Sequence, residues 1–479
     1  MMPGSASPPL LCVDLDGTLV STDTLDECLL RLVRYRPLLV LLLPFWMLRG
    51  KAYFKDRVAA ATAHLLGPLP YRESVLRYIR EHANGSEPVV LATAANYRVA
   101  EHVSRDLGLF TEVMASDEQL NLSGERKLAK IREFADGRPF AYIGDHAKDV
   151  PIWLAAERAI VVGSSQGLES RIAEVPEVVV IPPDQKSTLR DWVRQLRSHQ
   201  WSKNLLLVAP LVLAHKVFSL PAVIACLLAV VAFSLTASAV YIGNDLVDLP
   251  FDRNHPRKRS RPLASGVITI RSAAAVAAGL LAAAFGISLA FLPIMFFWML
   301  LGYIAINFTY SVWLKRIAVL DVLLLAGFYA YRVLIGAVAI GAVISPWLLA
   351  FSMFFFLGLG MMKRFADLVL TAKSEQTSVA GRSYTTDDTE FFRSVGTASS
   401  CVAVLVLALY LQSAEVTRLY QRPQYLWLVC PLVLYWNMRA WLIAQRGEMP
   451  DDPILFALRD PASYVVGAIC AVLMVLATL

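Results

Sequence analysis

The sequence is poor in charged residues. Only 18% of its 479 residues are charged and 56% are hydrophobic, whereas an average soluble domain has about 25% charged residues. The shortage lies in one part of the chain, because residues 1–203 hold 25 basic and 25 acidic side chains and residues 204–479 hold the remaining 20 and 14. These numbers exclude a single soluble globule and predict a soluble domain followed by a membrane domain.

Two further absences narrow the class of protein. The six cysteines form no CxxC pair and no metal-type spacing, which argues against a disulfide framework and a zinc site. The first residues, MMPGSASPPLLCVDLDG, have no basic segment followed by a long apolar core. They are therefore not typical of a secretory signal, and we expect the first domain to stay in the cytosol.

Residues 1–182 are predicted to form an α/β domain. Short apolar runs such as PLLCVD, PVVLAT, FAYIGD and EVVVI alternate with helical stretches, a pattern typical of a parallel, Rossmann-like sheet with crossover helices. A long helical insertion follows the first run and contains an apolar stretch from Pro37 to Leu48. Because this stretch is too short to span about 30 Å of hydrocarbon, it is interpreted either as a buried cap helix or as a segment on the membrane surface.

The rest of the chain is predicted to be an all-α membrane domain. Residues 183–203 form a polar linker with an interfacial helix, and residues 204–479 contain roughly nine apolar segments of spanning length. Basic residues concentrate in the even-numbered connections, whereas the opposite connections carry only Lys216, Arg418 and Arg422. This asymmetry predicts a multi-pass protein of the plasma (inner) membrane with a cytoplasmic N-terminal domain.

The run LLCVDLDGTLV places two carboxylates, Asp14 and Asp16, at the end of the first predicted strand. In phosphoryl transfer such a pair divides the work: Asp14 attacks phosphorus and holds Mg²⁺, and Asp16 acts as general acid and base. One such pair is weak evidence by itself, but further polar residues follow at suitable strand ends. They are Thr93 in VVLATAAN, Lys127 in SGERKLAKI, and Asp145 and Asp149 in YIGDHAKD.

With these four motifs in order, residues 9–182 resemble the haloacid dehalogenase (HAD) superfamily of phosphatases. The resemblance implies a helical cap and assigns Thr93 and Lys127, with Lys130 as the alternative lysine, to the phosphoryl oxygens. These groups also suit the negative charge of a transferring phosphoryl group. A decayed, non-catalytic domain is the competing interpretation. The magnesium ligands implied are Asp14, Asp16, Asp145 and Asp149.

A second acidic cluster stands at the predicted cytosolic end of the second membrane helix, in YIGNDLVDLPFDRNHPRKRSRPLASG. Asp245, Asp248 and Asp252 fall at i, i+3 and i+7, so a helix would place them on one face, with Asn244 one turn from Asp248. Charge beside a membrane is by default functional, and three adjacent carboxylates favour a bound Mg²⁺. The alternative is a simple positive-inside loop. Cations for phosphate groups follow at His255, Arg257, Lys258, Arg259 and Arg261.

The NDxxDxxxD pattern, the sequence HQWSKN at 199–204 and the helix count resemble the UbiA superfamily of intramembrane prenyltransferases. The resemblance implies that Asn244 and the three aspartates bind a magnesium diphosphate, and it includes Lys203 among the substrate-binding residues. Enzymes of this superfamily that ionise an allylic diphosphate usually carry a second Asp-rich motif after helix six. Here that segment reads MMKRFADLVL, with only Asp367.

The same segment, with TYSVWLKRIAVLDVLLLAGFYAYRVLIGAVA before it, is more similar to the decaprenyl-phosphate phosphoribosyltransferase branch. That branch moves phosphoribose from phosphoribosyl diphosphate (PRPP) to a polyprenyl phosphate. Arg332 is interpreted either as a phosphate ligand or as a structural partner of a helix-end carbonyl or Asp321. Further substrate-binding candidates are Lys315, Asp321, Lys363 and Arg364.

The sequence is therefore compatible with three functions. The first is a Mg²⁺-dependent membrane phosphoribosyltransferase with its own phosphatase. The second is a UbiA-type transfer of a prenyl group from a polyprenyl diphosphate to an aromatic or other acceptor, with an independent HAD domain. The third is a scaffold with two inactive sites. The expected partners are a polyprenyl phosphate or diphosphate, a soluble phosphorylated co-substrate such as PRPP, and membrane lipids, with no nucleic acid.

Overall fold

The computed structural model divides into two compact units. Unit 1 comprises Met1–Arg197 and Tyr241–Ala278, and unit 2 comprises Ser198–Val240 and Gly279–Leu479. The residues that the structure describes are 9–83, 88–163, 166–182, 187–343, 345–373, 383–450 and 453–479.

Unit 1 is built on a six-stranded parallel sheet with the order β3-β2-β1-β4-β5-β6, which confirms the predicted α/β class. The order reverses at β1, because β2 lies on one side of it and β4 on the other. Ligands of such sheets bind at the carboxyl ends of the strands beside this reversal. The strands are β1 Leu10–Val13, β2 Val89–Asn96, β3 Glu112–Ser116, β4 Phe140–Gly144, β5 Arg158–Val162 and β6 Glu177–Ile181.

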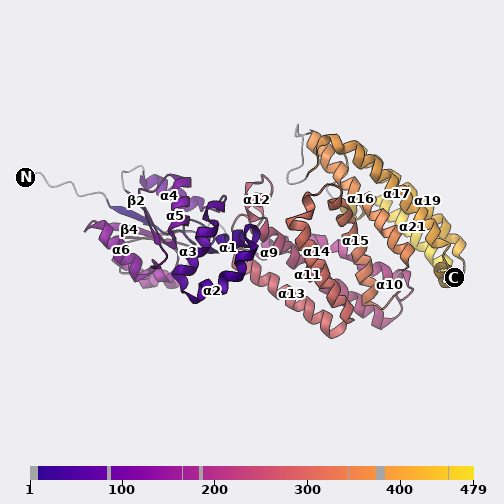
Figure 1. Ribbon diagram of the computed structural model, residues 1–479, viewed down its shortest axis with the longest axis horizontal. Helices are drawn as coiled ribbons and strands as arrows, with labels where there is room; N and C mark the ends of the chain where they lie inside the picture. The colour runs from indigo at the N-terminus through magenta and orange to yellow at the C-terminus, as the bar shows by residue number, and fades with distance from the viewer. Residues whose placement is uncertain are drawn as a thin grey trace, which may run out of the picture. The chain divides into compact units, whose positions relative to one another are not determined.

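Both faces of this sheet are covered. Leu11 and Val13 pack into an apolar cluster with residues of α3 (Lys51–Thr62), α4 (Glu73–Ala83) and α5 (Tyr97–Leu107). Leu10 and Cys12 pack into a second cluster with residues of α6 (Glu125–Ala135) and α7 (Val150–Ala155). Figure 1 labels most of these strands and helices. Successive side chains of a strand point to opposite faces, so a continuous apolar run is what a doubly covered parallel strand requires.

The helices of unit 1 fall between these strands and after them. They are α1 Thr24–Tyr35, α2 Leu43–Leu48, α3 Lys51–Thr62, α4 Glu73–Ala83, α5 Tyr97–Leu107, α6 Glu125–Ala135, α7 Val150–Ala155, α8 Gln166–Glu169, α9 Leu189–Gln195 and α12 Leu249–Asn254. Short 3₁₀ helices include η1 Pro37–Leu42 and η6 Lys258–Ser260. The insertion after β1 is helical, as expected of a cap.

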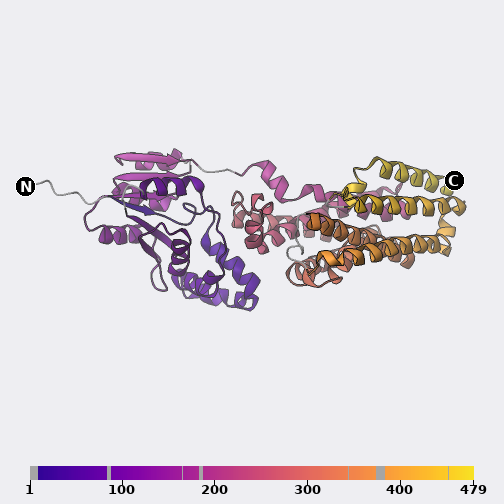
Figure 2. The same ribbon diagram turned by 90° about the horizontal axis from the view of Figure 1, so that it is seen from above.

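Eight helices among the described residues are long and apolar enough to cross a membrane. Figure 2 shows α19 and α21, in yellow, side by side. Six of them are α11 Leu220–Val247, α13 Ile270–Phe291, α14 Ile294–Val312, α15 Leu320–Ala339, α16 Pro346–Lys373 and α21 Pro461–Thr478. The other two are Thr386–Leu411, which contains α17 Thr389–Leu411, and Pro423–Gln445, which contains α19 Val429–Gln445. Shorter helices are α10 Ala209–Leu213, α18 Ala414–Leu419 and α20 Pro453–Ala457.

The first of the nine predicted spans, around Val208, has a different form. It consists of the 3₁₀ helix η5, Ser198–Val208, followed by α10. It has 11 residues of 3₁₀ helix and 5 of α-helix. At roughly 2.0 Å per residue for a 3₁₀ helix and 1.5 Å for an α-helix, a straight segment of this kind is about 30 Å long, which equals the thickness of the hydrocarbon layer. The described residues therefore form eight long helices and one mixed segment of comparable length.

Candidate active sites

Three carboxylates converge at the carboxyl ends of β1 and β4. Asp14 follows β1, Asp145 follows β4, and Asp149 lies in the next turn. Oxygens of these three groups all lie within 4.8 Å of one another. Among the described residues, this is the one set of three ligand groups close enough to share a metal ion.

The loop after β1 is shaped around this cluster. Gly17 has a φ of +77°, and a Cβ at this position would overlap the Asp145 carboxylate. A residue without a Cβ fits both requirements. The next side chain, Thr18, donates its hydroxyl hydrogen to Asp145 at 3.0 Å. The sequence DGT therefore places a small residue and then a donor beside the second strand end.

Lys127 is the ammonium of the cluster. Its Nζ lies 3.0 Å from Asp14 and 3.6 Å from Asp149, and it donates to the Tyr142 hydroxyl at 2.7 Å. The Tyr142 hydroxyl in turn donates to Asp149 at 3.0 Å. Burial works against the charged form of Lys127, but Asp14 and Asp149 outweigh it and raise the pKa of this ammonium. The alternative lysine, Lys130, is exposed and pairs with Glu133.

These carboxyls fit a cation. Burial first, and then the charge of Asp14, raises the pKa of Asp145 to about 7. Burial and Asp14 also raise the pKa of Asp149. Such shifts record the cost of crowding negative charge in a partly dry site, a cost that a bound cation relieves. A set made only of carboxylate oxygens matches the preference of Mg²⁺.

Two of the predicted HAD residues lie differently from the expectation. Asp16 is not in the three-carboxylate group; it accepts a hydrogen bond from the Thr24 amide at 2.8 Å. Burial, with a smaller contribution from Asp23, raises its pKa to about 7. Thr93 is fully buried, and its hydroxyl oxygen accepts from the Ala95 amide at 3.0 Å. The residue on the pocket wall is its neighbour, Ala94.

The cluster opens into a cavity of 430 Å³. Asp14, Asp16 and Lys127 line it together with two lysines of α3, Lys51 and Lys55. The Lys55 ammonium donates to the Ala94 carbonyl at 2.6 Å. Thr269 and Arg271 of the segment 241–278 complete the wall. A pocket lined by several cations beside a cluster of carboxylates suits a phosphate ester.

The second acidic cluster does not form one helical face. Helix α11 ends at Val247 and α12 begins at Leu249, with Asp248 between them. Pro250 stands in the first turn of α12, where a missing amide hydrogen is tolerated. In the interior of a continuous helix the same proline would break the helix. The prediction of one continuous helix is therefore wrong at this point. Because the chain forms two helices here, the three aspartates fall into two groups.

Asp245 and Asp252 form the first group. The same nitrogen of Arg261 lies 3.1 Å from Asp245 and 2.6 Å from Asp252. Asp245 also accepts from Gln195 and Arg197, whereas Asp248 binds Arg34 at 2.8 Å. A single positive centre thus already bridges two of the three aspartates.

The remaining predicted residues of this segment lie at its surface. Asn244 is half-buried on α11, and Arg257 and Lys258 are exposed. The Lys258 ammonium lies 3.9 Å from Asp252. Lys258 therefore borders the aspartate pair, and both cations are exposed.

In unit 2, a buried arginine lies within a ring of aromatic side chains. Arg332 of α15 donates to Asn204 of η5 at 3.1 Å and to the Phe328 carbonyl at 2.6 Å. Its guanidinium lies 5.3 to 5.8 Å from the ring centres of Phe233, Tyr303 and Tyr329, and the Lys203 ammonium lies 5.8 Å from Tyr329. Phe328 lies one turn before Arg332 within α15, so this carbonyl is inside the helix and is not the helix-end carbonyl that was predicted.

The predicted pairing of Arg332 with Asp321 is wrong, because Asp321 has another arginine. Arg364 of α16 lies 3.0 Å from Asp321 and 3.1 Å from Asp367. The Tyr384 hydroxyl also donates to Asp321. This buried ion pair joins α15 to α16. Arg364 and Asp321, both predicted to bind substrate, therefore have structural partners in the protein. Lys315 and Lys363 are half-buried on η7, Leu314–Arg316, and on α16.

Comparison with known proteins identifies the two parts. The sequence model of the UbiA prenyltransferase family matches residues 205–459, more than half of the chain. The chain belongs to the UbiA prenyltransferase family. The model of haloacid dehalogenase-like hydrolases matches residues 11–153. Both are enzyme families, so the predicted fusion of a transferase with a hydrolase in one multi-pass membrane protein is confirmed.

The chain is similar to two sequence relatives and one solved structure. An uncharacterized protein, y4nM, of Sinorhizobium fredii is 37% identical over 474 residues, which cover 98% of this chain and 91% of that protein. The decaprenyl-phosphate phosphoribosyltransferase of Mycolicibacterium smegmatis is 32% identical over 256 residues, 51% of this chain and 77% of that enzyme. A solved UbiA homolog from Archaeoglobus fulgidus bound to GPP and Mg²⁺ has 19% identity and a TM-score of 0.44, covering 60% of this chain and 97% of that one.

Several residues that complete these UbiA and HAD sites were not singled out from the sequence. Tyr142 lies within a buried strand run and gives no signal of its polar role. Lys55 follows the apolar stretch of the cap, and its spacing of four from Lys51 was the available hint. Arg34 and Arg271 are single arginines whose partners are 214 and up to 248 positions away, a separation that no local pattern reveals.

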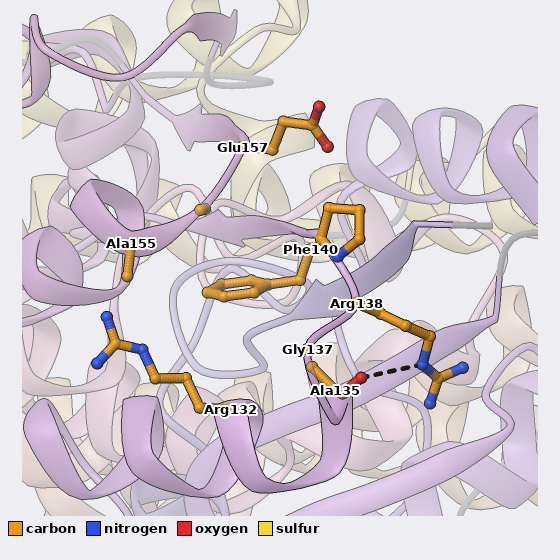
Figure 3. A pocket seen from close by; sticks show the side chains of 9 residues that line it. Arg132, Ala135, Gly137, Arg138, Phe140, Ala155 and Glu157 are labelled. Atoms are coloured by element: carbon orange, nitrogen blue, oxygen red, sulfur yellow. Dashed lines mark hydrogen bonds between the residues drawn. The ribbon is translucent and has the colours of Figure 1, made fainter. Parts of the chain in front are cut away.

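Another cavity of the HAD-like part lies away from this chemistry. It has 670 Å³ and is lined by residues at the start of β4 and the ends of α6 and α7, among them Arg132, Arg138, Phe140 and Glu157 (Figure 3). The Arg138 side chain donates to the Ala135 carbonyl at 3.0 Å. Because the three clustered carboxylates follow the carboxyl ends of β1 and β4, this cavity is at the opposite edge of the sheet.

Proposed function

We propose that the protein transfers phosphoribose from PRPP to a polyprenyl phosphate and that its HAD-like part removes a phosphate monoester from a related product. In the first step an oxygen of the lipid phosphate forms a bond to the anomeric carbon of ribose, and the diphosphate leaves with the bonding electron pair. In the second step the ribose 5-phosphate ester is hydrolysed to an alcohol and inorganic phosphate.

The first step is supported by the pairing of the acidic residues of α15 and α16 with an arginine. Asp367 and Asp321 both bind Arg364, so the described residues of α15 and α16 present no second acidic cluster for the metal of an allylic diphosphate. Relatives at 32–35% identity are named decaprenyl-phosphate phosphoribosyltransferase. A sugar diphosphate needs one metal-binding cluster, since the lipid brings only a monophosphate nucleophile.

For this transfer, Asp245 and Asp252 would hold Mg²⁺, which neutralises the leaving diphosphate. Lys258 borders the pair, Arg257 precedes it in the chain, and both are exposed to incoming phosphate. Arg332 and Lys203 are proposed to bind phosphate groups of donor or lipid, since the aromatic ring around Arg332 weakens competition from water. We further infer that the chain resides in the inner membrane with its N-terminal domain in the cytoplasm, where PRPP is soluble.

For the hydrolysis, we assign Asp14 as the nucleophile and Asp16 as the acid that protonates the departing ester oxygen. The ammonium of Lys127 neutralises first the negative charge of Asp14 and then that of the phosphoryl oxygens. Asp145 and Asp149 would hold Mg²⁺ with Asp14, and this ion supplies charge for the transferring group. Water then hydrolyses the phosphorylated Asp14 and releases inorganic phosphate, with Asp16 accepting the proton.

The test is incubation of the purified protein in detergent with PRPP, polyprenyl phosphate and Mg²⁺, followed by mass analysis of the lipids. We expect a polyprenyl phosphoribose product that is lost in Asp252→Asn, because that change removes one charged oxygen from the pair. The matched control is Asp387→Asn, an acidic residue outside the cluster. Conversion of a polyprenyl diphosphate with an aromatic acceptor, without any product from PRPP, would establish the prenyltransferase function instead.

A further inference from the structure

The cap of the HAD-like part carries an apolar surface that no described residue of unit 1 covers. In the segment Pro37–Leu48, Leu38 is 80% exposed, Leu41 72%, Phe45 65% and Leu48 85%. Their spacing of three, four and three places them on one side of a helix. Soluble domains seldom expose a contiguous apolar patch of this kind without a partner.

The opposite side of the same segment is also apolar and is already used. Trp46 is buried, and Leu39, Val40 and Leu43 pack against the core of the cap. A surface helix of a soluble protein would turn a polar face outward. This segment has an inner apolar face for the protein and an outer apolar face for something else.

The charges beside the patch indicate its partner. Residues 28–55 contain six basic side chains and no Asp or Glu. Among them, Arg36 and Arg49 flank the apolar segment, Lys51 follows, and all three are exposed. Apolar side chains bordered by arginine and lysine complement the acyl boundary and anionic headgroups of a bilayer.

The start of the segment is held at the end of a membrane-spanning helix. Arg34, three residues before Pro37, donates to the Val247 carbonyl at 2.6 Å and to Asp248 at 2.8 Å. Val247 is the last residue of α11, which is one of the eight candidate spans. The patch therefore begins close to the level at which the chain leaves the hydrocarbon.

The end of the segment leads directly to the phosphatase pocket. Helix α3 begins at Lys51 and contributes Lys51 and Lys55 to the pocket wall. Arg271, in the first turn of the spanning helix α13, lines the same pocket and pairs with Asp23 and Asp26 of the cap. Two independent connections thus place the pocket beside the ends of spanning helices.

We propose that Pro37–Leu48 lies in the headgroup and acyl boundary of the bilayer and that the phosphatase pocket consequently takes a phosphate monoester carried on a membrane lipid. The second half rests on the proposed hydrolase function, whereas the first half is independent of it. The reaction is the hydrolysis described above: water supplies the oxygen, the lipid-linked alcohol leaves, and inorganic phosphate is released.

The position of the segment is tested by nitroxide labels in the full chain, reconstituted in nanodiscs of phosphatidylethanolamine and phosphatidylglycerol, with the native cysteines replaced by alanine. Labels at Leu41→Cys and Leu48→Cys are compared with a label at Leu154→Cys, an apolar residue of α7 that is 47% exposed. Molecular oxygen concentrates in lipid and a nickel chelate stays in water. We expect the ratio of oxygen to chelate collision rates to be at least severalfold higher at positions 41 and 48.

Equal ratios at all three positions would overturn the membrane placement. Spin–spin broadening between labels at position 41, observed with two chains in one nanodisc, would also overturn it, because a second copy would then cover the patch. Both readouts are spectroscopic, so they remain decisive even if the chain shows no transfer from PRPP.

The substrate class is tested with Leu41→Glu/Phe45→Glu, and Leu154→Glu serves as the matched control. The probes are soluble p-nitrophenyl phosphate and a synthetic polyprenyl phosphoribose 5-phosphate in the same vesicles. We expect the double variant to lose at least tenfold in hydrolysis of the lipid probe and to keep wild-type hydrolysis of the soluble probe. An equal loss on both probes, or a wild-type protein that hydrolyses only the soluble one, would overturn the lipid assignment without touching the transferase.

Discussion

The Asp14 carboxylate is held by the Lys127 ammonium at 3.0 Å and by the Leu15 amide at 2.8 Å. Both contacts place an N–H group against an oxygen of the proposed nucleophile. Asp14→Asn keeps the shape and removes the charge, so we expect phosphatase activity to fall by about a thousandfold or more. The measurement is release of inorganic phosphate with Mg²⁺ present.

The control for this variant is Glu133→Gln, which changes an exposed carboxylate that pairs with Lys130 outside the pocket. Lipid transfer from PRPP is expected to be unchanged in both proteins. A variant at position 14 that retained wild-type hydrolysis would contradict the covalent mechanism.

Asp16 gives the phosphatase a pH dependence. Burial and Asp23 raise its pKa to about 7, so the protonated acid persists up to that pH and is lost above it. Hydrolysis of ribose 5-phosphate, whose alkoxide leaves poorly, should then fall about tenfold per pH unit above about pH 7. p-Nitrophenyl phosphate needs no proton on its leaving group and should show no such fall.

The comparison is made on kcat/KM at saturating Mg²⁺, and Asp16→Asn should abolish the difference between the two substrates. If both substrates lost activity in parallel above pH 7, the titrating group would be one that both reactions need, such as Asp145, whose pKa also lies at about 7.

Site residues that directly follow a strand can be predicted from the sequence better than residues that complete the site from elsewhere in the fold. Asp14 and Asp145 follow directly after apolar strands, and parallel strand ends meet at one edge, so their convergence was predictable. The hydroxyl of Tyr142 and the guanidinium of Arg271 enter through tertiary packing. Neither position is distinguished from an ordinary core tyrosine or loop arginine by its neighbours in sequence.

Among the elements, the contact of α15 with η5 depends on one glycine. A Cβ at Gly336 would overlap the backbone of Leu207, which has no freedom to rotate away. Gly336→Ala is therefore expected to destabilise the membrane part by about 1–3 kcal/mol, as overpacking does. The measurement is the apparent melting temperature of the protein in detergent.

Gly327→Ala is the control, since it lies on the same helix and the Cβ that alanine adds there would meet no described atom within 4 Å. There the substitution should leave stability unchanged or raise it by up to about 1 kcal/mol through helix propensity. A larger loss at position 327 than at 336 would refute the close-approach argument.

The elements themselves were predictable in kind and less so in form. Apolar length identified the eight long helices, but η5 has a 3₁₀ conformation that length and hydropathy do not distinguish. At the aspartate cluster, the helical spacing of Asp245, Asp248 and Asp252 was misleading because Pro250 starts a new helix. That proline was visible in the sequence, and its fixed φ and missing amide hydrogen were the overlooked signal.

For the whole molecule, the distribution of Lys and Arg gives an orientation that can be tested. The loop with Arg257, Lys258 and Arg259 should face the cytosol, and the short connection containing Lys216 should face the other side. In intact cells, a thiol at Ser260→Cys is expected to resist an impermeant maleimide, and a thiol at Ser219→Cys to react. The reverse pattern would contradict the orientation and the supply of cytosolic PRPP.

The pocket wall formed by Thr269 and Arg271 also bears on how such a protein can evolve. Arg271 meets Asp26 and Asp23 across 245 and 248 positions of sequence. A recombination event that moved only the phosphatase codons to another gene would carry the carboxylates but leave these two wall residues behind. The y4nM protein, which aligns with 98% of this chain, spans both segments in one polypeptide. We therefore expect a phosphatase part moved alone to lack the side of its pocket wall that Arg271 forms and to leave Asp23 and Asp26 without this arginine.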